Sequence, residues 1–120
     1  MNQGDAVATT DRKPLNTVPP GGTFLVMRGF YEGLELPLDR DWMVIGRGRS
    51  ADVVIAEPTI SRAHAAIGHD DKGFFMQDLG STNGTRVNGE RQNHARLYDG
   101  DQILLGKLML QVSVPKLGAE

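Results

Sequence analysis

The sequence predicts an all-β protein, and three observations carry this prediction. No window of about 11 residues has apolar side chains at the i, i+3, i+4 and i+7 positions that mark an amphipathic helix. Fifteen glycines separate short apolar runs, at a spacing of roughly 8 to 12 residues that is typical of sandwiches and barrels. Asn-Gly pairs at residues 83–84 and 88–89 favour type I′ turns between strands, because both residue types tolerate positive φ. We therefore expect short strands joined by tight turns.

The expected strands occupy residues 23–114, between two tails. Residues 1–22 have no hydrophobic periodicity and end in two prolines and two glycines, so we expect a flexible N-terminal tail. Leucines alternate with other residues over 34–38, and Pro37 among them indicates an edge strand. Pro115 ends the last strand and begins a short C-terminal tail, 115–120. The predicted strands are 23–28, 34–38, 42–45, 53–55, 65–67, 73–79, 102–105 and 108–114, with a hairpin around Asn83-Gly84 and a further turn at Asn88-Gly89.

Length, charge and composition restrict the class of protein. A chain of 120 residues is sufficient for one domain with its own hydrophobic core. The formal net charge of -2 disfavours a general binder of nucleic acids or anionic membranes. The sequence has no cysteine, which excludes disulfides and thiolate metal sites, and we find no apolar run of membrane-spanning length and no secretory signal. We expect a cytoplasmic protein with no nucleic-acid or membrane partner.

Hydrogen-bond donors gather in three segments that lie between predicted strands. Arg47 follows one strand, Ser61 and Arg62 precede another, and Thr82 and Asn83 follow a third. The side chains of these five residues all supply donors, and none of the five is an acid. Loops of this composition, brought together at one place, suit a dianion such as a phosphate.

The order and spacing of these motifs give the chain a family resemblance. Gly46-Arg47, Ser61-Arg62-Ala63-His64 and Asn83-Gly84 are followed by Leu97, Gly100, Asp101, Ile103 and Gly106. In these motifs, over roughly residues 23–114, the chain resembles the forkhead-associated (FHA) domain, a module that binds phosphothreonine peptides. The resemblance implies an FHA-like β-sandwich of two twisted, mainly antiparallel sheets with the binding loops at one end. It also implies a binding protein rather than an enzyme.

The resemblance further implies which residues would hold the phosphopeptide. Arg47 would clamp two phosphate oxygens with its planar guanidinium. Ser61 and Thr82 would donate their hydroxyl groups to the phosphate, and Asn83 would pair with the peptide main chain. Arg62 would play a supporting role. Each residue also has a simpler structural interpretation: Arg47 as a solvated arginine paired with an acid, Ser61 as a turn cap.

Six further residues receive secondary roles. Gly46, His64 and Gly84 are expected to support the loops, Gly46 by leaving room for the backbone to turn and His64 by hydrogen bonds. Arg49, Ser50 and Arg86 are candidates for selecting the residues that follow the phosphothreonine. For each of these last three taken alone, a solvated surface side chain is the simpler interpretation.

Two other classes of function are compatible with the sequence. One is a scaffold that docks proteins without any phosphate. The other is a hydrolase built on Ser61 and His64, or on a metal held by His64, His69 and His94. Three histidines in separate segments give a weak metal signal, and no acid is evident that would orient His64. We therefore expect no catalysis, no metal and no cofactor.

The expected partner is a phosphothreonine-containing protein, a Ser/Thr kinase or its substrate. The chain also has threonines of its own in the predicted tail, Thr9 and Thr10. If a kinase modified either one, the tail would become an intramolecular ligand for the same loops and would switch off binding of external partners. A tail that only solvates the domain is the simpler interpretation.

Overall fold

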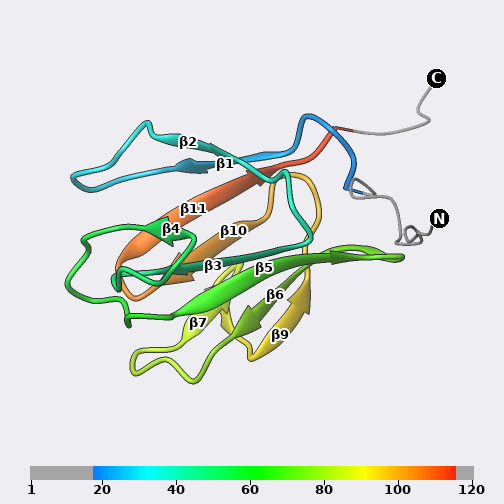
Figure 1. Ribbon diagram of the computed structural model, residues 1–120. Helices are drawn as coiled ribbons and strands as arrows, with labels where there is room; N and C mark the ends of the chain where they lie inside the picture. The colour runs from blue at the N-terminus through cyan, green and yellow to red at the C-terminus, as the bar shows by residue number, and fades with distance from the viewer. Residues whose placement is uncertain (1–17, 116–120) are drawn as a thin grey trace, which may run out of the picture.

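The computed structural model describes residues 18–115. Within this range the regular secondary structure consists of β-strands, which turns and loops connect. The strands form two sheets that face each other (Figure 1), so the predicted all-β sandwich is confirmed. Residues 18–115 contain no helix with the length and apolar character needed to cross a membrane.

The larger sheet has six strands and is antiparallel throughout. Its spatial order is β2 (Glu35–Pro37), β1 (Thr23–Val26), β11 (Leu108–Ser113), β10 (Gln102–Leu105), β7 (Thr85–Val87) and β8 (Glu90–Arg91). The strand that contains Pro37 lies at the edge, as the sequence predicts, where the missing amide proton interrupts no ladder. The short strands β7 and β8, and the strand His94–Arg96 of the other sheet, have no counterpart among the predicted strand ranges.

The smaller sheet has five strands and carries most of the predicted binding loops. Its order is β4 (Val53–Val54), β3 (Trp42–Gly46), β5 (Ala65–Asp70), β6 (Gly73–Asp78) and β9 (His94–Arg96). Only the β3–β4 pair is parallel. Figure 1 shows the chain leaving β3 and β4 at the same end of the sandwich. The loops that contain the Gly-Arg and Ser-Arg motifs are therefore neighbours.

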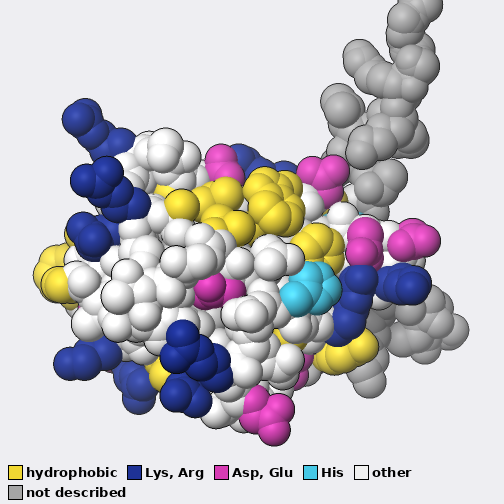
Figure 2. Space-filling model, turned by 90° about the horizontal axis from the view of Figure 1, so that it is seen from below, with side chains coloured by type: hydrophobic (Ala, Val, Ile, Leu, Met, Phe, Trp, Pro, Cys, Tyr) yellow, Lys and Arg dark blue, Asp and Glu magenta, His cyan; other side chains and the backbone are white. Residues whose placement is uncertain are grey.

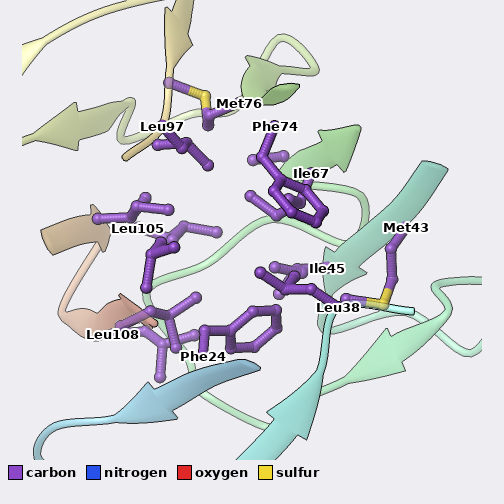
Figure 3. Close-up of a cluster of buried hydrophobic side chains, with 14 of the residues drawn as sticks. Phe24, Leu38, Met43, Ile45, Ile67, Phe74, Met76, Leu97, Leu105 and Leu108 are labelled. Carbon is purple, nitrogen blue, oxygen red and sulfur yellow. The ribbon is translucent and has the colours of Figure 1, made fainter. Parts of the chain in front are cut away.

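The hydrophobic core fills the space between the two sheets. Alternate residues of each strand point inward, as in Phe24 and Val26 of β1 and Met43 and Ile45 of β3. Figure 3 shows Phe24 of β1 and Ile45 of β3 among the inner side chains that fill this space. The core joins the two sheets, and the loops at the end of the sandwich lie outside it.

The Asn83-Gly84 pair does not form the expected hairpin. β6 before it belongs to the five-stranded sheet and β7 after it to the six-stranded sheet, so the chain crosses between sheets at this point. Asn88 has φ 51° and Gly89 φ 89°, and these two residues form the tight turn between the paired residues of β7 and β8, as a type I′ hairpin requires. The second pair is thus the true hairpin, and the first lies in a connecting loop.

The packed part of the chain begins before the first strand. Val18 is 6% exposed and belongs to the core cluster, and the Gly22 carbonyl accepts a hydrogen bond of 2.8 Å from the Leu38 amide. Residues 18–22 were expected to belong to the tail because they contain no periodic hydrophobic pattern. A single buried side chain, however, produces no such pattern. The packed domain therefore begins no later than Val18, five residues before Thr23.

Candidate functional site

Backbone hydrogen bonds join the loop after β3 to the loop before β5. The Arg47 amide donates to the Ser61 carbonyl at 3.0 Å, and the Gly48 amide donates to the Arg62 carbonyl at 3.0 Å. A Cβ atom at Gly46 would overlap the Arg62 carbonyl. Any larger residue there would push the two loops apart.

Arg47 projects from the end of β3 into a small basic pocket. Its Nε donates to the Ile60 carbonyl at 2.8 Å, which fixes the plane of the guanidinium. The remaining donors of an arginine fork are its terminal nitrogens. The pocket has a volume of about 490 Å³ and is lined by Arg47, Gly48, Arg49, Ser50 and Arg62. Three arginines and no acid line it, so it suits an anion.

Ser61 is oriented toward the third loop. Its Oγ accepts a hydrogen bond of 3.0 Å from the Thr82 amide. A serine hydroxyl has two acceptor positions and one donor, so this bond holds the oxygen in place without using the proton. Ser61 can therefore donate that proton to a ligand, and Thr82, whose side chain is exposed, lies beside it.

His64 connects the second and third loops from inside the protein. Its side chain is completely buried. The Ser61 amide donates to Nδ1 at 3.0 Å, and Nε2 lies 2.9 Å from the Gly84 carbonyl. An amide can only donate and a carbonyl can only accept, so the ring carries its proton on Nε2 and donates it to Gly84.

This geometry does not join His64 to the Ser61 hydroxyl. Both ring nitrogens are occupied by backbone groups, whereas a general base must reach the hydroxyl proton of its nucleophile. The Ser61 hydroxyl oxygen is instead bonded to the third loop. The pair is arranged to brace loops.

Thr59 is a junction that the sequence did not single out. Its hydroxyl donates to Glu57 Oε2 at 2.7 Å and accepts from the Lys107 amide at 2.8 Å. Its carbonyl accepts from Asn83 Nδ2 at 2.8 Å. One residue thus ties together the second loop, the third loop and the β10–β11 turn. The local sequence, Glu57-Pro58-Thr59, indicates a turn through its proline and threonine but not these distant partners.

The Thr59 hydroxyl also affects Glu57. Hydrogen bonds from the Thr59 hydroxyl, then from its amide, lower the pKa of the Glu57 carboxyl. The carboxylate is therefore held by its own loop.

Asp78 organises the third loop. Its carboxylate accepts hydrogen bonds from the hydroxyls of Ser81 and Thr85, both at 2.7 Å, and from the amides of Gly80 and Ser81. Partial burial raises the pKa of Asp78, but these four hydrogen bonds lower it by more, and the resulting pKa lies below the usual value. Ser81 in turn accepts from the Gly84 amide at 2.9 Å. The loop conformation therefore depends on an ionised carboxylate.

The loop end of the molecule is positively charged although the whole chain is not. Figure 2 shows Lys and Arg side chains gathering at the end that carries the loops, with the Asp and Glu side chains of that face toward the middle and the opposite end. Within residues 18–115, the arginines of the pocket form no ion pair, whereas Arg40 and Arg96 do. The pocket arginines keep their charge available for a ligand.

The three histidines lie in separate environments. His69 packs edge-on against Phe74, with ring centroids 4.7 Å apart, and His94 stacks on Phe75 at 5.2 Å, while His64 is buried between loops. The described part of the chain brings together no group of three metal-binding side chains.

The remaining candidates fall into three groups: two line the pocket, two lie outside it, and two fall outside the described residues. Arg49 and Ser50, expected to select neighbouring residues, line the pocket itself. Arg86 lies on β7, opposite Arg91 of β8, and lines no part of that pocket. Asn83 uses one amide proton on Thr59 and keeps a second proton and a carbonyl for other partners. The tail residues 9 and 10 fall outside the described residues.

Comparisons with known proteins agree with this architecture. Residues 43–106 match the family model for the FHA domain. The chain is 34% identical over 110 residues to the oxoglutarate dehydrogenase inhibitor of Corynebacterium diphtheriae, covering 92% of this chain and 77% of that protein. It is 36% identical over 105 residues to the glycogen accumulation regulator GarA of Mycobacterium tuberculosis, covering 86% of this chain and 65% of that protein.

A solved FHA domain, described for phosphothreonine-dependent interactions, superimposes with a TM-score of 0.73 at 33% identity. The superposition covers 80% of this chain and 98% of that one. The matched region of the family model contains the Gly-Arg, Ser-Arg-x-His and Asn-Gly motifs, and these are the motifs that the structure brings together at one end of the sandwich. On the strength of both its motifs and its fold, this chain belongs to the FHA domain family.

Proposed function

We propose that this protein is a non-catalytic adaptor that binds phosphothreonine peptides in Ser/Thr kinase signalling. The observation that carries the proposal is the anchoring of Arg47 at the pocket. Its Nε donates to the Ile60 carbonyl, and the residue lines a pocket that contains two further arginines and no acid. A preorganised fork of donors binds a dianion without first having to be ordered.

The phosphate of a phosphothreonine supplies what this pocket lacks. It carries about −1.5 to −2 charges at pH 7 and three acceptor oxygens. Arg47 takes two of the oxygens, and the Ser61 hydroxyl, held by the Thr82 amide, donates to the third. The Thr82 hydroxyl and Arg62 complete the shell, and the free groups of Asn83 pair with the peptide backbone. Charge-assisted bonds of about 1.5–3 kcal/mol each support a micromolar affinity.

The relatives indicate the kind of partner. They are named as an inhibitor of oxoglutarate dehydrogenase and a regulator of glycogen accumulation. By analogy, this chain acts in the cytoplasm and couples a threonine kinase, or the proteins it modifies, to a metabolic enzyme. The alignment with GarA spans 65% of that protein, so functions that reside in the remainder of that relative are outside the analogy.

The test measures one peptide in two states of phosphorylation. An oriented phosphothreonine library first selects a peptide, and titration calorimetry then compares its phosphorylated and unphosphorylated forms on the wild type and on Arg47→Ala. We expect micromolar binding only with phosphate, weakened about thirtyfold or more by the substitution, which removes ~2 kcal/mol of bidentate contact. Arg47→Lys should recover only part of the loss. Equal binding of the two forms would favour a phosphate-independent scaffold instead.

The tail ligand remains part of the proposal, with a geometric restriction. Thr10 precedes Val18 by eight residues, and such a tether spans at most about 28 Å when fully extended. Figure 1 shows the start of the described chain and the loops after β3 and β4 at opposite ends of the sandwich. Strands of six residues are already about 20 Å long, so a phosphate at Thr10 reaches the pocket only with the tail nearly straight.

Four forms of the chain test the tail switch. Protein phosphorylated at Thr10, or separately at Thr9, is compared with unmodified protein and with a chain that starts at Thr17, which keeps the buried Val18. A switch predicts that only the phosphorylated forms bind an external phosphopeptide more weakly. Identical affinities in all forms would remove the switch.

A further inference from the structure

Two arginines outside the phosphate pocket face each other across the β7–β8 hairpin. Arg86 and Arg91 are directly paired positions, so their side chains leave the same face of the sheet with Cβ atoms about 5 Å apart. Like charges at opposite positions destabilise a hairpin. Within residues 18–115, neither arginine forms an ion pair that would offset the repulsion. Both positive charges are therefore without a counter-ion within the described part of the chain.

Arg91 lies directly on the third binding loop. A Cβ atom at Gly84 would be 2.7 Å from Cζ and Nε of Arg91, so the guanidinium rests on the face of the glycine. Gly84 is also the residue whose carbonyl binds His64. It follows Thr82 by two residues, and two residues of chain span at most about 7 Å. The charge of Arg91 is therefore within reach of a ligand held beside Thr82.

We propose that Arg91, assisted by Arg86, forms a second anion-binding site that selects phosphothreonine ligands with another negative charge. The inference rests on the proposed function, because the ligand must already be held at Arg47. The second charge is a carboxylate side chain or a second phosphate. From the separation above, it lies about two to four residues from the phosphothreonine in an extended peptide.

Arg86 is placed to join this site. Its Nη1 lies 3.4 Å from the Gly89 carbonyl, which is at the long limit for a hydrogen bond. Breaking so weak a contact costs little, so the side chain is free to swing toward an anion that Arg91 holds. An anion between the two guanidinium groups would also remove their mutual repulsion.

The test uses a phosphothreonine peptide with alanine at every neighbouring position. Aspartate or a second phosphothreonine then replaces each alanine in turn, up to about four residues away on both sides. On the wild type, we expect calorimetry to show a gain of about fivefold for aspartate at one position and roughly tenfold for the second phosphate. A gain from one substituent alone identifies which of the two sources the site prefers.

Substitutions then assign the gain to Arg91. In Arg91→Gln the gain should fall below about twofold while the all-alanine peptide keeps its affinity, and Arg91→Lys should retain much of the gain because the charge remains. Lys72→Gln is the matched control, because Lys72 is an exposed cation in the β5–β6 turn, at the other end of the sandwich (Figure 1). It should leave every gain unchanged.

The outcomes separate this inference from the proposed function. If the gain is the same in Arg91→Gln and wild type, the second site does not exist. If Arg91→Gln weakens all peptides equally, Arg91 only packs on Gly84, and the inference is again wrong. If the all-alanine peptide binds the wild type equally well with and without its phosphate, the proposed function itself is wrong.

Discussion

His64 offers the sharpest test of how the binding loops are held. His64→Ala removes the acceptor of the Ser61 amide and the donor to the Gly84 carbonyl, and it leaves a cavity at a position with no solvent access. Each abandoned backbone group costs about 1–2 kcal/mol, and the lost packing adds ~1 kcal/mol or more. We therefore expect a total loss of about 3–5 kcal/mol.

Thermal unfolding and peptide binding measure the two consequences separately. In a domain of this size each kcal/mol lowers the melting temperature by about 4–8 °C, so His64→Ala should lose roughly 15 °C or more. Its affinity for a phosphothreonine peptide should fall as well, because Ser61 and the third loop are no longer held at a fixed separation. His94→Ala is the matched control, because His94 is exposed and stacks on Phe75, away from the loops. It should change neither quantity greatly.

Two amide substitutions test the two hydrogen bonds of His64 separately. Asn at position 64 places an oxygen near the site of Nδ1 and can still accept from the Ser61 amide, whereas Gln places a nitrogen near Nε2 and can still donate to Gly84. His64→Asn and His64→Gln should each retain part of the stability lost in His64→Ala. A His64→Ala protein that melts and binds like the wild type would refute the brace. Hydrolysis of a phosphoester that disappears in Ser61→Ala would show that the pair is catalytic after all.

Three further predictions concern the loops around the pocket. Asp78→Asn should lower the free energy of unfolding at pH 7 by about 2 kcal/mol. Because the pKa of Asp78 is lowered in the folded state, this contribution is complete above the unfolded pKa of about 4 and is lost as the pH falls below it. The difference in free energy of unfolding between wild type and Asp78→Asn should therefore shrink below about pH 4, and a constant difference would contradict the role of the charge. Gly46→Ala should lower the free energy of unfolding by about 2–3 kcal/mol, because the added Cβ would overlap the Arg62 carbonyl. Gly48→Ala should lower it by less, since its Cβ would lie 3.0 Å from the Arg62 side chain; denaturant unfolding measures both. Thr59→Val should lose about 1–2 kcal/mol and raise the pKa of Glu57, which carboxyl NMR titration measures; an unchanged pKa would show that the hydroxyl is not its main hydrogen-bond partner.

Local patterns in the sequence predicted most of the strands correctly. Alternating apolar residues and glycine spacing indicated β1, β3, β5, β6, β10 and β11 close to their observed positions, because the period of two is a property of each strand by itself. The turn at Asn88-Gly89 was equally local, since it depends on two residues that tolerate positive φ. The site residues could be named for the same reason: their chemistry is that of their side chains, and their motifs are short. Their roles in phosphate binding are predictions that phosphopeptide binding measurements test.

The sequence by itself therefore determined the fold class, eight of the eleven strands in the described residues and the chemistry of the loops. The tertiary structure decided how the strands are ordered in the sheets and how the loops are joined. Thr59 receives the Lys107 amide from 48 residues away, and Asn83 reaches back 24 residues to Thr59. Asn83-Gly84 looked like a hairpin because its dipeptide is a turn signal, but which sheet takes the next strand depends on distant partners. Arg91 was overlooked because nothing near it in the sequence shows that it rests on Gly84. Contacts of this kind form only when the two sheets pack and bring distant segments together. Local periodicity in the sequence therefore cannot predict them.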